Sequence, residues 1–186
     1  DSEIYRVTLQ GLKGCGRAML SPSGKQMALG CSGTLDMDGN LVSADETGIV
    51  LLDSSVSPPT EIERISVYDK FGFAPQSELE FASETQVLAK TQTPYFGQGN
   101  NQLFALDLPS GEMRVLLEAA ANDDGTGKGV VYGGLLCTPS CNSTCLLADA
   151  DQGLIRRFDA KSDLSELEAV TVGSSSGLSP MGLGPF

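Results

Sequence analysis

The five cysteines have the most definite chemistry in this sequence, and they stand at Cys15, Cys31, Cys137, Cys141 and Cys145. Cys15 and Cys31 are equidistant from Ser23 in a Ser-Pro-Ser-Gly turn, which separates β-compatible runs at 17–20 and 25–29. If the two runs form a hairpin, the two thiols face each other across it. We therefore predict a Cys15–Cys31 disulfide, a bond that persists in oxidising compartments.

The remaining cysteines form a C-x₃-C-x₃-C group. Cys137 and Cys145 are symmetric about Cys141, across the loop 138–144, so a hairpin would bring them together as well. This predicts a Cys137–Cys145 disulfide and leaves Cys141 at a loop tip, free or bonded to another chain; a Cys137–Cys141 bond is the alternative closure. A zinc site would need a fourth ligand, and the chain has no His to complete one. Free buried thiols are the other alternative.

The Asp-Met-Asp-Gly-Asn segment at 36–40 could hold a calcium ion. Asp36, Asp38 and the later Asp45 resemble the spacing of an EF-hand-like loop, and Asn40 adds an amide oxygen. Carboxylates on alternate residues around a Gly turn can converge on a hard cation. The first position of the loop is Thr, and the last is Asp in place of the usual Glu. The alternative is an ordinary β-turn in which Gly39 and Asn40 adopt positive φ.

Other residue types give little support for catalysis. A Ser or Cys nucleophile needs a neighbouring base, most often His, and the sequence contains none. The Gly-rich run at 123–129 lacks the spacing of a phosphate-binding loop and indicates a flexible connection. Tyr95 and Phe96 precede a polar, Gly-rich stretch, so we predict that they lie in a partner-binding loop. The alternative is that both rings pack inside the fold.

Charge and hydropathy exclude two classes of partner. The chain has 12 Lys and Arg against 24 Asp and Glu, for a net charge of −12, which repels nucleic acids and anionic membrane surfaces. No stretch approaches the ~18 apolar residues that would span a bilayer. Because the chain begins at Asp1, we expect a processed or truncated product, consistent with removal of an export signal. No cofactor other than calcium is expected.

These residues must be positioned by strands, because helical patterns are nearly absent. Short apolar runs alternate with Gly, Pro, Ser, Asn and Asp, which mark turns. Three apolar runs, 48–53, 102–107 and 153–159, each end in Asp and recur at an interval of roughly 50 residues. Each is followed by a turn and a further strand, and each is preceded by an earlier strand, which we expect to end near 41–44, 86–90 and 145–148.

Four strands per roughly 50 residues is the period of a β-propeller blade. The sequence therefore predicts an all-β fold: a β-propeller fragment of about three four-stranded antiparallel blades, with partial blades at both ends. Blades bury their faces only against neighbours, and propellers close with about 4 to 8 of them. We expect further chain, or further copies, to complete the ring. The expected units are the last strand of a preceding blade at 1–12, blades at 13–68, 69–118 and 129–173, and the start of another blade at 174–186.

The segment 35–53 resembles the repeat of NHL and SMP-30/gluconolactonase-like propellers, in which a D-G-N turn leads into a strand ending in Asp. Weaker copies of the pattern lie at 146–159 and 86–107. The resemblance implies a propeller, commonly six-bladed, and many such proteins are interaction platforms. Its enzymatic members hold a central metal with acidic, Asn and sometimes His side chains, and no position of this sequence can be matched to those ligands.

The leading hypothesis is an exported propeller, secreted, periplasmic or extracellular, which binds a protein partner or assembles into a larger structure without catalysis. One alternative is a metal-dependent hydrolase or lactonase of the SMP-30-like type. The other is a calcium-stabilised structural subunit.

Overall fold

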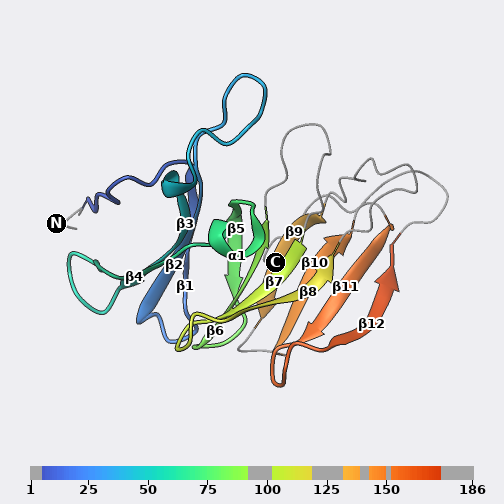
Figure 1. Cartoon of the computed structure of the whole chain (residues 1–186). Helices are drawn as coiled ribbons and strands as arrows, with labels where there is room; N and C mark the ends of the chain where they lie inside the picture. The colour runs from blue at the N-terminus through green and yellow to red at the C-terminus, as the bar shows by residue number, and fades with distance from the viewer. Residues whose placement is uncertain (1–5, 92–101, 119–131, 139–142, 150–151, 173–186) are drawn as a thin grey trace.

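The computed structural model describes residues 6–91, 102–118, 132–138, 143–149 and 152–172, and these residues form an all-β protein (Figure 1). The strands group into three antiparallel four-stranded sheets, each in simple sequence order across the sheet. The first contains β1 Cys15–Leu20, β2 Gln26–Ser32, β3 Thr47–Asp53 and β4 Thr60–Ile65. The second contains β5 Pro75–Phe81, β6 Gln86–Thr91, β7 Gln102–Asp107 and β8 Met113–Glu118. The third contains β9 Tyr132–Thr138, β10 Thr144–Asp149, β11 Leu154–Asp159 and β12 Glu166–Thr171.

The three sheets are arranged like a fan. β5 lies in the middle of the fan, in contact with β1 and β2 of the first sheet and with β9 of the third, while β4 and β12 lie at the two sides of the view in Figure 1. This arrangement confirms the predicted fold class of three four-stranded antiparallel blades. The predicted partial blades and blade boundaries stay predictions. Residues 6–14 form no strand, and Leu12 is buried against the outer face of the first sheet with Cys31, Val50 and Leu52.

The Asp that closes each third strand has a structural explanation. Asp53 accepts hydrogen bonds at Oδ1 from the backbone N–H (2.9 Å) and hydroxyl (2.5 Å) of Ser55. Asp107 accepts the same pair of bonds from Ser110, and Asp159 accepts bonds from the backbone of Lys161 and the hydroxyl of Ser162. The sequence repeat therefore marks a turn in which a carboxylate satisfies donors that the strand cannot.

In the first sheet, the strand that pairs with β3 is not where the sequence repeat predicts it. The sequence predicts that a strand ending at 41–44 precedes β3, and this is wrong: β3 pairs with β2 in continuous register from Gln26–Asp53 to Ser32–Thr47. Residues 33–46 instead form a long connection that ends in a short 3₁₀ helix, Ala44–Glu46. The D-G-N turn lies in this connection, so it does not lead directly into a strand.

Two apolar cores join the three sheets. One lies between the first and second sheets, and the other lies between the second and third sheets and includes both Cys137 and Cys145. Between the first two sheets, a short helix α1, Tyr68–Phe71, brings Phe71 onto Phe104 with ring centroids 5.0 Å apart. The second sheet contributes apolar side chains to both cores, so it has a neighbour on each of its faces.

Close backbone contact fixes the first junction at its inner edge. A Cβ on Gly16 of β1 would lie 2.2 Å from Cβ of Ser77 on β5, and a Cβ on Gly30 of β2 would lie 2.4 Å from the carbonyl oxygen of Gln76. Real Cβ atoms do not approach other atoms this closely. Glycine at these two positions is therefore what lets the first and second sheets meet.

Candidate functional site

Both predicted disulfides are present, and both join the first strand of a sheet to the second. Cys15 and Cys31 stand directly opposite each other on β1 and β2, with Cα atoms 3.8 Å apart. Cys137 and Cys145 do the same on β9 and β10, with Cα atoms 4.0 Å apart. Disulfides of this kind indicate an oxidising compartment. Cys141, which the pairing leaves over, lies outside the described residues.

The Asp-Met-Asp-Gly-Asn segment forms a tight turn organised by Asp36. Its Oδ1 accepts hydrogen bonds from the backbone N–H of Asp38 (2.9 Å) and of Asn40 (2.8 Å), and its Oδ2 accepts one from Asn40 Nδ2 (3.3 Å). The backbone bond from Asn40 is the main reason why the pKa of Asp36 lies below its usual value. Gly39 has a φ of 82° as expected for a turn, whereas the expected positive φ of Asn40 is not observed.

The four residues predicted to bind calcium do not all lie on this turn. Asp45 lines a separate cavity of about 230 Å³ together with Arg64 and Asp69. Within the described ranges, no three His, Cys, Asp or Glu side chains form a group that could hold a metal ion. The calcium site at Asp36, Asp38, Asn40 and Asp45 stays a prediction. Tyr95 and Phe96, predicted to bind a partner, lie outside the described residues.

Charged side chains that the sequence analysis did not single out occupy the junction between the second and third sheets. Lys90 of β6 is 2% exposed, and its ammonium bonds to Glu78 Oε2 (2.5 Å) and to the carbonyl oxygen of Gly133 (2.6 Å). The other carboxylate oxygen of Glu78 accepts the backbone N–H of Leu135 at 3.2 Å. Glu78 therefore links a buried cation of its own sheet to the edge strand of the next.

Glu80 makes the equivalent link two residues further along β5. It is 4% exposed, and it accepts a hydrogen bond from the backbone N–H of Cys137. Burial raises its pKa to about 7, against the opposing attraction of Arg17 and that hydrogen bond. Glu78 and Glu80 thus engage alternate N–H groups of β9, the edge strand of the third sheet, which would otherwise remain unpaired.

Sequence alternation could have suggested part of this arrangement. In the segment 77–81, Ser-Glu-Leu-Glu-Phe, the glutamates share one face of a strand while Leu79 and Phe81 share the other. That pattern normally indicates a half-buried strand with a solvated acidic face. Only the neighbouring sheet, whose edge strand lies more than fifty positions later in the chain, makes this face buried.

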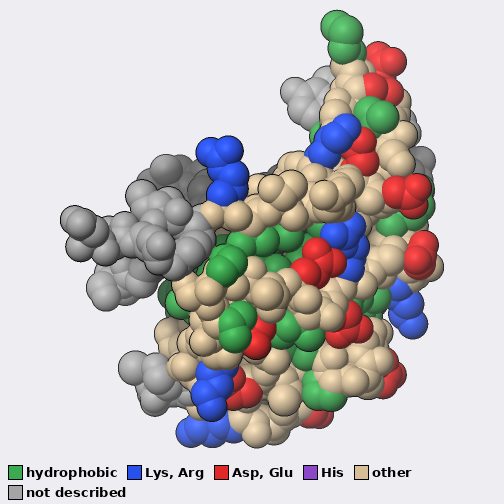
Figure 2. Space-filling view, turned by 90° about the vertical axis from the view of Figure 1, so that its left-hand side faces the viewer, with side chains coloured by type: hydrophobic (Ala, Val, Ile, Leu, Met, Phe, Trp, Pro, Cys, Tyr) green, Lys and Arg blue, Asp and Glu red, His purple; other side chains and the backbone are tan. Residues whose placement is uncertain are grey.

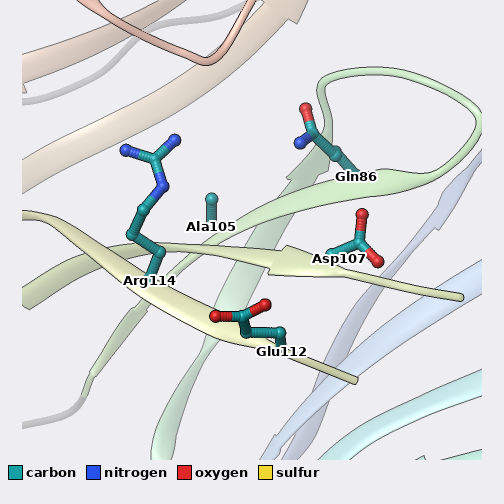
Figure 3. A pocket seen from close by; sticks show the side chains of 5 residues that line it. All are labelled: Gln86, Ala105, Asp107, Glu112 and Arg114. Carbon is teal, nitrogen blue, oxygen red and sulfur yellow. The ribbon is translucent and has the colours of Figure 1, made fainter. Parts of the chain in front are cut away.

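A small polar cavity lies at the outer end of the same junction. It has a volume of about 220 Å³ and is lined by Gln86, Ala105, Asp107, Glu112 and Arg114 (Figure 3). Two of its charged groups already have partners: Asp107 bonds to Ser110 in its own turn, and Arg114 donates a hydrogen bond to the backbone oxygen of Asp163 in the β11–β12 turn. The cavity is therefore part of the junction between the second and third sheets.

Comparison with known proteins supports the fold and no closer relationship. Neither a protein-family profile nor a curated protein sequence matches the chain. The β-propeller domain of Cps50 (Swd1) from Myceliophteria thermophila matches 86% of this chain and 45% of that chain, with 12% sequence identity and a TM-score of 0.53. The match shows that the chain has the fold of part of a β-propeller.

Two further solved propellers resemble the chain less well. A putative 6-phosphogluconolactonase from Bacteroides fragilis matches 86% of this chain and 40% of that chain, with 12% identity and a TM-score of 0.45. The periplasmic gluconolactonase PpgL from Pseudomonas aeruginosa matches 85% of this chain and 40% of that chain, with 16% identity and a TM-score of 0.44. The chain spans less than half the length of each of the three structures. None of the described helices has the length and apolar content needed to cross a bilayer.

Proposed function

We propose that this chain is part of an exported β-propeller, secreted or periplasmic, that binds a protein partner and has no catalytic role. The two disulfides support export, because bonds between facing cysteines are maintained where the surroundings are oxidising. The fold supports a binding role in general terms, since a rigid scaffold of sheets presents its connecting loops for recognition.

The proposal of a non-catalytic role rests on the contacts made by the carboxylates of the first strands of the sheets. Among the described first strands β1, β5 and β9, the only carboxylates are those of Glu78 and Glu80. Both are engaged by backbone N–H groups of β9, and Glu78 also by Lys90. Acidic groups on these strands therefore hold sheets together, whereas a metal-dependent lactonase would need them to face a ligand at the propeller axis.

Lactone hydrolysis with and without divalent cations tests this conclusion against the SMP-30-like alternative. We expect no hydrolysis above the uncatalysed rate in Ca²⁺ or Zn²⁺, and no bound metal in the purified chain. Hydrolysis that is abolished by a chelator would show that the chain belongs to a catalytic propeller. A rise in melting temperature on adding Ca²⁺, without hydrolysis, would favour the calcium-stabilised structural subunit.

Intact mass under non-reducing and reducing conditions tests the exported state. We expect a mass difference equal to two disulfides in protein taken from the oxidising compartment of the producing cell. The paired change Cys15→Ser with Cys31→Ser is the control, because it should reduce this difference by half. Protein that carries four free thiols at these positions when isolated from its cell would contradict export.

A further inference from the structure

The connection 33–46 is longer than the fold requires. In the third sheet, residues 150–153 are enough to join the equivalent strands β10 and β11. The connection between β2 and β3 instead extends away from the first sheet and forms the most prominent projection in Figure 1. We call residues 34–42, which form its outer part, the β2–β3 arm.

The β2–β3 arm has a defined conformation of its own. Leu35 and Leu41 form an isolated antiparallel bridge, the backbone N–H of Val42 donates to the oxygen of Thr34 at 2.9 Å, and that of Gly39 donates to Asp36 at 3.1 Å. The Asp36 carboxylate closes the tip through its bonds to Asp38 and Asn40. An element that is already ordered loses little conformational entropy when it binds.

Its apolar side chains face solvent. Leu35, Met37 and Val42 are 39%, 105% and 59% exposed. Figure 2 shows the projection at the top of the molecule, with hydrophobic and acidic side chains along it and a basic side chain lower down. Met is well suited to such a position because its flexible, polarizable side chain adapts to the shape of a pocket. Apolar side chains grouped on one exposed element mark a contact surface.

Negative charge predominates around these side chains: Lys13 lies at the base of the connection, where its backbone oxygen accepts the N–H of Gly33, but its ammonium is paired with Glu46. No Lys or Arg occurs in the sequence between Lys25 and Arg64, while Asp36 and Asp38 lie on the arm itself. A second copy of this chain, with a net charge of −12, would be repelled, and so would an anionic membrane surface. A protein surface with positive charge around an apolar centre would be attracted.

We propose that the β2–β3 arm docks into a partner protein by inserting Met37 into an apolar pocket that is rimmed by Lys and Arg side chains. Leu35 and Val42 contact the walls of the pocket, and Asp38 pairs with the basic rim. The proposal rests on the proposed function, because it takes the partner to be a protein, and it adds the surface and the chemistry of recognition.

Site-specific photo-crosslinking in the producing cells tests the proposal directly. A benzophenone amino acid replaces Met37 in one strain and Ile62 in the other. Ile62 is a matched control, since it is 52% exposed and flanked by Glu61 and Glu63, but it lies on β4 and not on a projection. We expect a crosslinked partner peptide rich in Lys and Arg from position 37, at ten times or more the yield from position 62.

Three results would overturn the arm as the docking element: equal yields from both positions, a crosslink from position 37 to another copy of this chain, or a crosslink to lipid. If position 62 gives the higher yield of a protein adduct, the arm proposal is wrong and the proposed protein-binding function stands. If neither position, nor benzophenone placed on other exposed loops, gives any protein adduct, both are wrong.

Substitutions then separate apolar from charged recognition, with the crosslinked partner as the probe. Met37→Ser should weaken binding tenfold or more, Asp38→Asn should mainly slow association at low salt, and Ile62→Ser should change neither. All three side chains lie on the surface, so melting temperature and circular dichroism should match those of the unmodified chain. Binding by Met37→Ser within twofold of the unmodified chain would refute insertion of this side chain.

Discussion

The two junctions between the sheets are built in different ways. The first and second sheets meet through close backbone contact at Gly16 and Gly30 beside an apolar core, and at the surface Glu84 accepts hydrogen bonds from the backbone N–H and hydroxyl of Ser23. The second and third sheets meet through carboxylates, with Glu78 and Glu80 each accepting a backbone N–H of β9. The first junction depends mainly on shape, with the carboxylate contact of Glu84 exposed to solvent, whereas the second depends on buried charge as well.

This difference separates two ways of solving the same packing problem. An apolar, close-packed contact is insensitive to pH and salt but tolerates no added atom. A contact that relies on buried charge is destabilised strongly if one charged partner is removed, because the other charge is left buried without compensation. The two junctions should therefore respond differently to the same kinds of perturbation.

The largest effect is expected at Glu78. Glu78→Gln keeps the shape of the side chain but leaves the ammonium of Lys90, 2% exposed, without its carboxylate. Because an uncompensated buried charge is costly, we expect the free energy of unfolding to fall by about 3 kcal/mol in urea titrations. Lys13→Met is the matched control: it breaks the Lys13–Glu46 pair, in which Lys13 is 59% exposed, and should have little effect. Similar effects of both variants would mean that the second junction does not depend on its buried charge.

The next effect tests shape at the first junction. Gly16→Ala should lower the free energy of unfolding by about 2 kcal/mol, equally at all pH values, because the new Cβ overlaps that of Ser77. Combining it with Ser77→Gly removes the overlapping atom and should recover more than half of the loss. Strictly additive effects of the two changes would show that close contact at this point is not what holds the sheets together.

The pH dependence of the free energy of unfolding should depend on the second junction through Glu80. Its pKa of about 7 in the folded chain lies above the value of 4.5 expected when unfolded, so the folded state binds more protons between these pH values. The free energy of unfolding should therefore decrease as pH rises from 5 to 8. Glu80→Gln should remove this trend. Between pH 5 and pH 8, the free energy of unfolding of the variant should rise by about 2 kcal/mol relative to that of the unmodified chain. Parallel stability curves for the two proteins across this range would contradict the assignment.

The smallest effect is expected at the outer end of the second junction. Arg114→Met removes the hydrogen bond from the guanidinium to the backbone oxygen of Asp163. Because Arg114 is exposed, the loss should be about 0.5 kcal/mol. Calorimetry of this variant beside Glu78→Gln would show whether the junction is held mainly at its inner edge, as we expect.

The features that could be predicted from the sequence are those with local causes. The Asp at the end of each third strand is visible because it caps the turn that follows, so the same residue recurs once per sheet. The disulfide pairs are visible because residues equidistant from a hairpin turn must face each other, as Cys15 and Cys31 do. Local turn chemistry therefore gave both the period of the fold and its covalent links.

The features that were missed depend on distant partners. Leu41 and Val42 have good strand propensity, but β3 pairs with β2, and nothing near position 41 reveals that choice. The roles of Glu78 and Glu80 depend on N–H groups of β9 that are supplied more than fifty residues later. Exposed apolar residues of the β2–β3 arm resemble ordinary strand residues until their neighbours in space are known.

The backbone amide of Cys137 lies at the second junction, so its NMR signal can be used to observe that junction. The sulfur of Cys137 is bonded to Cys145, and its backbone N–H donates to Glu80. The environment of this residue therefore depends both on whether the disulfide is formed and on whether the carboxylate is ionised. In an isotope-labelled sample, the chemical shift and the deuterium exchange of this one amide would follow the separation of two entire sheets.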